Sequence, residues 1–211
     1  MTYRFLISLL LFAAMAFVAG GTAHATATPD APNGMQRAAF AGGCFWCMEQ
    51  PFRKLDGVVS VLSGYTGGNT VDPSYEAVSD GGTGHAEAVE VVFDPKIISY
   101  AKLLEVFWRN VDPTVQNRQF CDVGDQYRGA IFVRTAEQRV AAEASLAALR
   151  AHPRFKGQTL YTQIVAAGPF YAAEDYHQDY AHKNPKRYKY YRWSCGRDAR
   201  LGEVWGEAPT H

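Results

Sequence analysis

The chain has 211 residues, of which 47% are hydrophobic and 20% are charged, a composition that is ordinary for one globular domain. Its 21 basic and 21 acidic residues cancel, so the net charge gives no electrostatic basis for nucleic-acid binding. We therefore expect the partner to be a neutral small group or a protein surface.

Residues 1–25 are predicted to be a secretory signal peptide. Arg4 precedes an almost unbroken apolar run over residues 5–20, and small residues ending in Ala23-His24-Ala25 are typical of cleavage after Ala25. An uncleaved membrane anchor is the alternative, but the run is shorter than the about 20 residues that cross a bilayer as a helix. Cleavage would give a periplasmic or secreted protein with no stable membrane association.

The rest of the chain predicts one α+β domain with a mixed sheet, because strand and helix patterns alternate without a repeat or linker. Residues 26–36 are a polar, Pro-rich lead that we expect to be disordered, and residues 206–211 are a short tail. Two polar loops, 66–84 and 111–125, are long enough to be functional. The predicted strands are 37–41, 58–65, 86–93, 127–134 and 160–167, and the predicted helices are 46–55, 99–110, 135–151 and 172–181.

The segment Gly42-Gly43-Cys44-Phe45-Trp46-Cys47 lies at the predicted junction of the first strand and the first helix. Free backbone N–H groups and the positive end of the helix dipole converge at such a junction, so we expect the thiolate of Cys44 to be favoured. The glycines would allow a close approach, and an aromatic pair is an unusual helix start if only packing matters. A small core cysteine is the alternative, but the pattern favours a nucleophile.

This segment, extended to Glu49, resembles the active-site segment of the A-type peptide methionine sulfoxide reductases. Three more segments are similar to that family and follow in the same order along the chain: residues 63–68, 82–87 and 121–128. The resemblance covers residues 37–205, which would be the catalytic domain, and implies a ferredoxin-like α/β core with long active-site loops. It also implies reduction of methionine-S-sulfoxide, free or in proteins, to methionine, which repairs oxidised proteins.

Reduction of a sulfoxide needs a soft nucleophile, a proton for the departing oxygen and an apolar cradle for the S-methyl group. Cys44 would be the nucleophile. The resemblance assigns the proton donor to Glu87, at the end of the glycine-rich loop, where burial would keep the carboxyl protonated. Tyr75 and Tyr127 match two family tyrosines whose hydroxyls can bind the sulfoxide oxygen. Asp122 matches a family aspartate that helps to organise the site.

Phe45 and Trp46 would form the methyl-accepting wall of the pocket. His85 could assist as a base, but we expect an ordinary loop histidine. Glu90 should point away from Glu87 on the same strand, so that one carboxylate can be solvated while the other is buried. Glu49, on the first helix, is expected to be exposed or to support the site indirectly. The pair Phe107-Trp108 is expected to be core.

Attack by Cys44 would leave a sulfenic acid, with which a second thiol then condenses to a disulfide. Cys195 is the favoured resolving cysteine, because Ser194-Cys195-Gly196 suits a mobile C-terminal tail and family members commonly resolve from such a tail. Cys47, one helical turn from Cys44, is the alternative. Cys121, beside two aspartates, is expected to be an unreactive loop or core thiol. In an exported protein, part of this set could instead form a structural disulfide.

The disulfide would be reduced by a thioredoxin-like partner. No Gly-x-Gly-x-x-Gly motif follows a strand, so we predict no flavin or nicotinamide cofactor, and no second close cysteine pair complements Cys44 and Cys47 as metal ligands. Two other functions remain open. A secreted thiol-disulfide exchanger would use only Cys44 and Cys47, and a non-catalytic binding module would use only the aromatic pocket.

Overall fold

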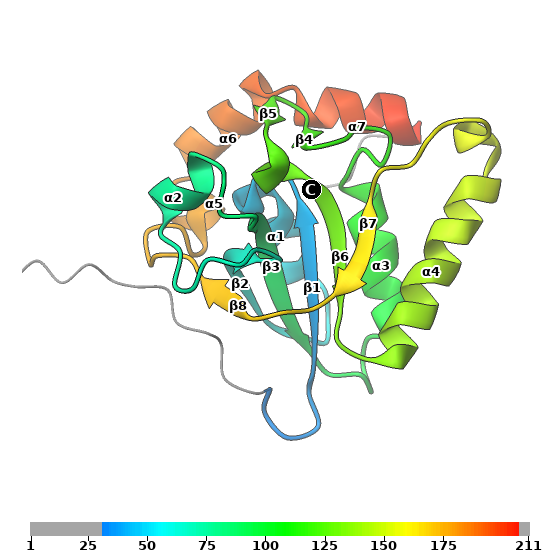
Figure 1. The fold of residues 1–211 in the computed structure, drawn as a ribbon, viewed down its shortest axis with the longest axis horizontal. Helices are drawn as coiled ribbons and strands as arrows, with labels where there is room; N and C mark the ends of the chain where they lie inside the picture. The colour runs from blue at the N-terminus through cyan, green and yellow to red at the C-terminus, as the bar shows by residue number, and fades with distance from the viewer. Residues whose placement is uncertain (1–30, 207–211) are drawn as a thin grey trace, which may run out of the picture.

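The computed structural model describes residues 31–206, so the predicted signal peptide, the first part of the polar lead and residues 207–211 lie outside the described part. Its main elements form a sheet backed by helices on one face (Figure 1). The sheet strands are β1 (Gln36–Gly42), β2 (Val58–Thr66), β3 (Ala86–Phe93), β6 (Gly129–Val133), β7 (Gln163–Ala166) and β8 (Phe170–Ala172). The longer helices are α1 (Phe45–Arg53), α3 (Tyr100–Arg109), α4 (Ala136–Ala151), α6 (Pro185–Ser194) and α7 (Arg197–Trp205).

The strands form one six-stranded mixed sheet in the order β7-β6-β1-β3-β2-β8. β1 pairs antiparallel with β3 and β6, β2 pairs antiparallel with β3 and β8, and β7 is parallel to β6. The four central strands, β6-β1-β3-β2, have the order and directions of a ferredoxin-like βαββαβ core. The predicted α+β domain with a mixed sheet is therefore confirmed.

The main core lies between the sheet and the helices α1, α3 and α4. Phe40 of β1 stacks on Phe52 of α1 at a ring-centroid distance of 5.0 Å and on Phe107 of α3 at 5.3 Å. All three rings are fully buried, and each contributes about 1.5–3 kcal/mol through burial of apolar surface. Trp108 is also buried, which confirms the prediction that Phe107-Trp108 is core.

Helix caps follow the sequence signals. Ser99 caps α3 by accepting a hydrogen bond from the N–H of Lys102, and Thr135 caps α4 by accepting one from the N–H of Gln138. The two long loops contain short elements that the pattern did not predict. These are α2 (Tyr75–Ser79), β4 (Arg118–Gln119), β5 (Asp122–Val123) and the 3₁₀ turn η1 (Asp125–Tyr127).

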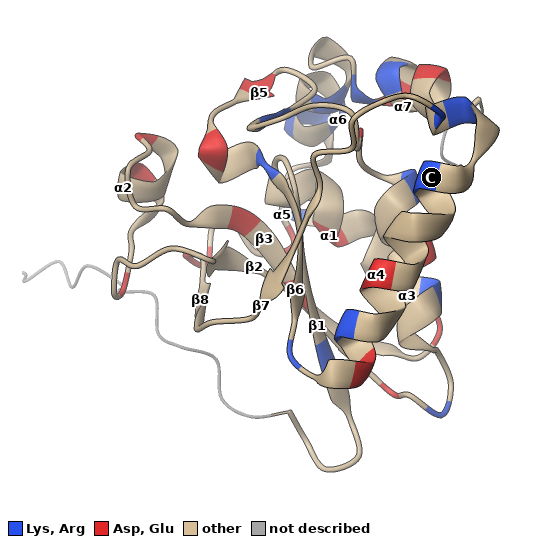
Figure 2. Ribbon diagram, turned by 45° about the vertical axis from the view of Figure 1, so that its right-hand side comes forward, with Lys and Arg blue, Asp and Glu red and all other residues tan. Residues whose placement is uncertain are grey.

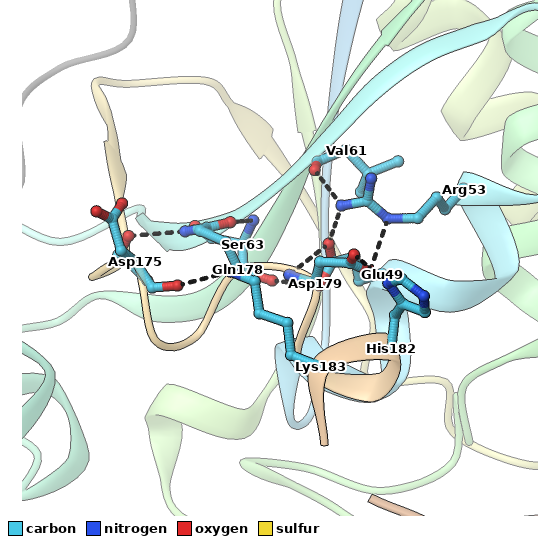
Figure 3. A network of polar contacts seen from close by, with 10 residues as sticks. Glu49, Arg53, Val61, Ser63, Asp175, Gln178, Asp179, His182 and Lys183 are labelled. Carbon is cyan, nitrogen blue, oxygen red and sulfur yellow. Dashed lines mark hydrogen bonds and ion pairs between the residues drawn. The ribbon is translucent and has the colours of Figure 1, made fainter. Parts of the chain in front are cut away.

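The predicted helix over 172–181 is wrong. Its first residues belong to β8, and turns lead from there to the short helix α5 (Tyr180–Lys183). The side chain of Gln178 accepts from the N–H of Ser63 at 2.9 Å and donates to the carbonyls of Ser63 and Ala173, so it pins this segment to β2 (Figure 3). Side-chain contacts with a distant strand replace the hydrogen bonds of a local helix.

The segment that carries Cys195 is also different from the prediction. Cys195 caps the C-terminal end of α6 and lies between two helices rather than in a loose tail. Arg197, at the start of α7, is 1% exposed and donates to the carbonyls of Gly42 and Asn110, and its guanidinium lies 4.3 Å from the ring centroid of Phe120. These contacts fix α7 against the end of β1.

Across residues 31–206, no helix combines the length and the apolar character that a bilayer span requires.

Candidate active site

Cys44 lies where β1 ends, as the N-cap residue of α1. Gly43, directly before it, has φ of +81°, and a Cβ there would come within 2.6 Å of the Cβ of Gln119. A residue with a side chain would therefore clash at this position, so the tight turn that carries Cys44 depends on glycine. Because β1 and β3 are antiparallel, the end of β1 and the start of β3 meet at the same edge of the sheet, which brings Glu87 to Cys44.

Glu87 is 3% exposed, and its Oε2 accepts a hydrogen bond of 3.0 Å from the N–H of Phe45. Burial, with a smaller contribution from nearby Asp122, raises the pKa of Glu87 to about 8 against the lowering effect of the Phe45 bond. The carboxyl is therefore mainly protonated at neutral pH. With Oε2 accepting from the backbone, the proton belongs on Oε1, and the group can act as an acid.

The tyrosines and Asp122 complete a small pocket of about 90 Å³ around these two residues. Asp122 of β5 accepts a hydrogen bond from the N–H of Cys44, and its Oδ2 accepts one of 2.7 Å from the hydroxyl of Tyr191. Burial, with Glu87 next, raises the pKa of Tyr75 to about 12 and also raises that of Tyr127. Both hydroxyls thus stay protonated as donors. The pocket is lined by Cys44, Phe45, Trp46, Tyr75, Glu87, Asp122, Tyr127 and Tyr191.

All seven residues predicted to act at Cys44 or to bind substrate line this one pocket. Sequence reasoning missed Tyr191, because nothing local distinguishes it among 12 tyrosines. Tyr191 lies one helical turn before Cys195 on α6, so a predicted helix there would have brought it to attention. The sequence pattern around Cys195 instead predicted a mobile tail. Burial and the neighbouring Cys44 and Asp122 raise the pKa of Tyr191, so it holds the Asp122 carboxylate as a neutral donor.

The apolar wall of the pocket is positioned by a buried histidine that the sequence did not single out. His177 is 2% exposed, and its Nδ1 accepts a hydrogen bond of 3.1 Å from the indole N–H of Trp46. Its ring lies 5.0 Å from Phe45 and 4.3 Å from Tyr75 between centroids. Trp46 also stacks on Tyr180 at 3.8 Å. Burial lowers the pKa of His177 to about 4, so the imidazole remains a neutral acceptor.

The protonation of Cys44 differs from the prediction. Burial raises the pKa of Cys44 well above its usual value, and Cys47, Glu87 and Asp122 raise it further. The N-terminal amides that would favour a thiolate donate elsewhere, from Cys44 to Asp122 and from Phe45 to Glu87. In the resting site Cys44 is therefore a thiol.

Cys47 lies one turn further along α1 and is buried against Cys44. The hydrogen bond from the Cys44 thiol, together with the charges of Arg197 and Arg192, lowers the pKa of Cys47 to about 6. The two sulfurs are thus hydrogen-bonded to each other, and ionisation is favoured at Cys47 over Cys44. Because the two side chains are in contact, Cys47 can accept the proton of Cys44, and it can also form a disulfide with Cys44.

Cys195 and Cys121 form a disulfide across 74 residues of sequence. The expectation that Cys121 is an unreactive free thiol is therefore wrong. The bond joins the loop before Asp122 to the junction of α6 and α7, so it lies beside the Asp122–Tyr191 hydrogen bond. Cys121, Asp122 and Cys195 are close enough to hold a metal ion, but the disulfide occupies both sulfurs.

The other carboxylates and His85 have structural roles. Glu90 is 1% exposed and pairs with Arg37 and Arg134, so the expectation that one strand carboxylate is solvated is wrong. Glu49 is also buried, pairs with Arg53 and accepts from the Ser63 hydroxyl and the Asp179 N–H (Figure 3). His85 accepts from the N–H of Gly68 and donates to the carbonyl of Thr70, which confirms it as a loop histidine.

A buried thiol beside its own base, a neutral carboxylic acid and two tyrosine hydroxyls can reduce a bound oxide: sulfur attacks, and the oxygen leaves with a proton. The fold and the site define a thiol-dependent oxidoreductase with a ferredoxin-like core. The sequence model of the family described as peptide methionine sulfoxide reductase matches residues 36–209.

Relatives and solved structures agree with this match. Peptide methionine sulfoxide reductase MsrA 2 of Caulobacter vibrioides is 48% identical over 198 residues, 94% of this chain and 97% of that protein. The structure of methionine sulfoxide reductase A of Corynebacterium diphtheriae is 34% identical with a TM-score of 0.69, covering 73% of this chain and 77% of that one. Reduced Mxr1 of Saccharomyces cerevisiae is 32% identical with a TM-score of 0.69, covering 76% and 91%. The chain belongs to the peptide methionine sulfoxide reductase family.

Proposed function

We propose that this chain reduces methionine sulfoxide to methionine, with Cys44 as the nucleophile and Glu87 as the acid. The observation that carries the proposal is the pairing, in one pocket of about 90 Å³, of a buried sulfur with a carboxyl whose pKa is about 8. A substrate that needed only thiol exchange would have no use for a proton donor held neutral by burial. This pairing therefore favours a reductase over a thiol-disulfide exchanger.

In the first step, Cys44 reacts with the sulfoxide while neighbouring groups of the pocket transfer protons and donate hydrogen bonds. Cys44 passes its proton to Cys47 and attacks the substrate sulfur, while Glu87 gives its proton to the sulfoxide oxygen. Tyr75 and Tyr127 donate hydrogen bonds to that oxygen as it gains charge. The S–O bond breaks, methionine leaves, and the hydroxyl ends on Cys44 as a sulfenic acid, so sulfoxide and thiol become thioether and sulfenic acid.

The aromatic wall is the part of the site suited to the methyl group. Phe45 and Trp46 are held in fixed orientations by His177 and Tyr180. The methyl of the substrate would contact this wall, its oxygen would meet the tyrosine hydroxyls and Glu87, and its sulfur would face Cys44. A site with three distinct contacts discriminates between mirror-image sulfoxides. We propose the S epimer as the substrate, free or in proteins.

For regeneration we propose that Cys47 condenses with the sulfenic acid of Cys44, releasing water and leaving a disulfide. Contact between the two thiols in the resting site supports Cys47, the alternative among the predicted resolving residues, whereas Cys195 is bonded to Cys121. Reduced Cys195 and Cys121 then take over that disulfide by thiol exchange, with the two electrons passing to Cys44 and Cys47. In this proposal, a Cys121–Cys195 disulfide such as the one in the structure is the product of the exchange.

The final electron donor is proposed to be a thioredoxin-like dithiol protein. The yeast relative Mxr1 has also been solved in complex with Trx2. Such a donor would reduce Cys121–Cys195 and leave as its own disulfide, so that the full cycle consumes one dithiol per sulfoxide.

Purified protein should convert methionine-S-sulfoxide, and not the R epimer, to methionine with dithiothreitol as reductant. Cys44→Ala should form no methionine. Cys47→Ala, reduced beforehand and freed of dithiothreitol, should form about one equivalent per chain, more slowly than the wild type because it lacks the proposed base, and then stop. Persistent turnover by Cys44→Ala contradicts the proposal. Mass spectrometry after one turnover of fully reduced Cys121→Ser/Cys195→Ser should show a Cys44–Cys47 disulfide; Cys44 left as an unresolved sulfenic acid in this variant would make Cys195 the resolving residue.

We also propose that the protein is exported, on the basis of the apolar run over residues 5–20 and the Ala23-His24-Ala25 site. Expression of the full chain in a bacterial host, followed by N-terminal sequencing of the periplasmic fraction, should give Thr26 as the first residue. A product that retains Met1 in the cytoplasm would contradict export without affecting the proposed activity.

A further inference from the structure

The two pairs of cysteines differ in their access to a protein donor. Cys44 and Cys47 are 6% and 1% exposed, so a disulfide between them is shielded from an incoming thiolate. Cys121 is exposed and Cys195 is partly exposed. Thiol exchange requires direct approach of the attacking sulfur to one sulfur of the disulfide. A protein donor therefore meets the chain at Cys121–Cys195.

The helix that ends at this disulfide is strongly basic. α6 has the sequence PKRYKYYRWS, with four basic residues and no acidic one. Arg192 is buried and pairs with Asp198, but Lys186, Arg187 and Lys189 are exposed. Within residues 31–206, no carboxylate lies within ion-pair distance of these three side chains, and Figure 2 shows basic residues along α6. The chain as a whole is neutral, so this is a local excess of positive charge.

The same helix also exposes large aromatic side chains. Tyr190 and Trp193 are 70% and 76% exposed, and their ring centroids are 6.1 Å apart, as residues three apart on one helix face should be. Trp193 lies two residues before Cys195 and borders a groove of about 500 Å³, which Lys189 and Lys54, the C-cap residue of α1, also line. Tyrosine, tryptophan and arginine are enriched at protein–protein interfaces, and exposed lysines beside them add charge that can attract an acidic partner.

We propose that this basic-aromatic face of α6, made by Lys186, Arg187, Lys189, Tyr190 and Trp193, is the docking surface for an acidic dithiol protein that reduces Cys121–Cys195. The proposal rests on the proposed function, because it supplies the site where the donor binds. Charge complementarity selects an acidic donor, and the two aromatic rings supply apolar contact area that a small thiol could not use.

The geometry also indicates which sulfur is attacked. The N–H of Cys121 lies 3.2 Å from the Sγ of Cys195 and donates to it, so it stabilises Cys195 as the departing thiolate. Cys121, the more exposed of the two, is then the sulfur that the donor thiolate attacks. A mixed disulfide between the donor and Cys121 forms, and the second donor thiol displaces Cys121. Two electrons and two protons pass to Cys121 and Cys195, and the donor leaves as a disulfide.

The test compares a protein donor with a small one, using the full chain. The double variant Lys186→Glu/Lys189→Glu is assayed with saturating methionine sulfoxide, either with bacterial thioredoxin, thioredoxin reductase and NADPH or with dithiothreitol. We expect the KM for thioredoxin to rise about tenfold or more, with turnover in dithiothreitol unchanged. The wild-type KM should rise with salt, and the variant should lose that dependence. Trp193→Ala should raise the same KM without changing the salt dependence.

Lys96→Glu/Lys102→Glu is the matched control, because both residues are exposed, lie near the start of α3 and give the same change in net charge. It should leave the KM for thioredoxin unchanged. An unchanged KM in the α6 variants, with normal dithiothreitol turnover, would overturn the docking surface and leave the function intact. Binding of α6 to phosphatidylglycerol vesicles, with donor kinetics insensitive to the variants, would also overturn it. Wild-type protein that fails even with dithiothreitol would instead refute the proposed function.

Discussion

Replacement of Glu87 by glutamine should stabilise the folded protein at neutral pH while it removes activity. The folded-state pKa is about 8, against 4.5 in the unfolded chain, so folding at pH 7 requires the carboxylate to take up a proton. A group with a raised pKa contributes its full stability below its unfolded pKa, and that contribution decreases as pH rises toward the folded pKa. At 1.36 kcal/mol per pKa unit, ionisation of Glu87 in the unfolded state costs the wild type about 3 kcal/mol at pH 7.

The same arithmetic gives a pH profile. The cost is about 1 kcal/mol at pH 5 and levels off near about 5 kcal/mol above pH 8. The side chain introduced by Glu87→Gln would stay neutral in both states and would keep an acceptor for the Phe45 N–H, so the variant escapes this cost. Urea unfolding of both proteins at pH 5, 7 and 8.5, with Cys121–Cys195 intact, should show the variant gaining stability relative to the wild type as pH rises.

Glu87→Gln should lose activity although it gains stability. Single-turnover reduction by the wild type should decrease above about pH 8, as Glu87 loses the proton that it must donate. Glu87→Gln should reduce the sulfoxide about a hundredfold or more slowly at every pH and should lack this decrease. A stability difference that does not vary between pH 5 and 8.5 would refute the assignment of Glu87 as a neutral buried acid.

Three further substitutions test the support of the site. Arg197→Met should lower the free energy of unfolding in urea by about 3 kcal/mol and raise the pKa of Cys47, because it leaves two buried carbonyls without their donor and removes a nearby charge. Gly43→Ala should cost about 2 kcal/mol or more, against about 1 for Gly81→Ala, since only the first forces a Cβ clash in addition to a positive φ. His177→Leu should raise the KM for methionine-S-sulfoxide about tenfold, and His177→Asn should restore it by returning an acceptor to Trp46, whereas equal KM values would exclude this positioning role.

Local sequence signals were sufficient for much of the fold. The caps Ser99 and Thr135 and the bounds of β3 depend on near neighbours, and the structure has each where the pattern placed it. The burial of both faces of β3 did not follow from its alternating pattern. The failure at residues 172–181 has a different cause. Gln178 bonds the backbone of Ser63, 115 residues away, and no local preference encodes such a contact.

The site also combines features that local sequence predicts with features that depend on distant contacts. Cys44 and Glu87 could be named from their motifs, but the environment that sets their pKa values comes from distant loops. The Cys121–Cys195 bond joins residues 74 apart, and four cysteines allow three pairings that the sequence cannot rank. The raised pKa of Cys44 comes first from burial and next from Cys47, with smaller contributions from Glu87 and from Asp122, which also accepts the N–H of Cys44.

That protonated resting state has a chemical consequence for a repair enzyme. Thiolates, not thiols, react with peroxides, so a permanently ionised Cys44, which lines the pocket, would be oxidised by the same agents that oxidise methionine, whereas Cys47 is 1% exposed and does not line the pocket. Burial, the neighbouring Cys47 and the diversion of the helix-start amides to Asp122 and Glu87 favour the protonated, unreactive form of the Cys44 sulfur in the empty pocket. In the proposed mechanism, Cys47 receives that proton when Cys44 attacks a bound sulfoxide. The proposed mechanism therefore makes Cys44 reactive only when the pocket holds a sulfoxide. Glu87 and Asp122, which help to keep the thiol protonated in the empty pocket, belong to the same site.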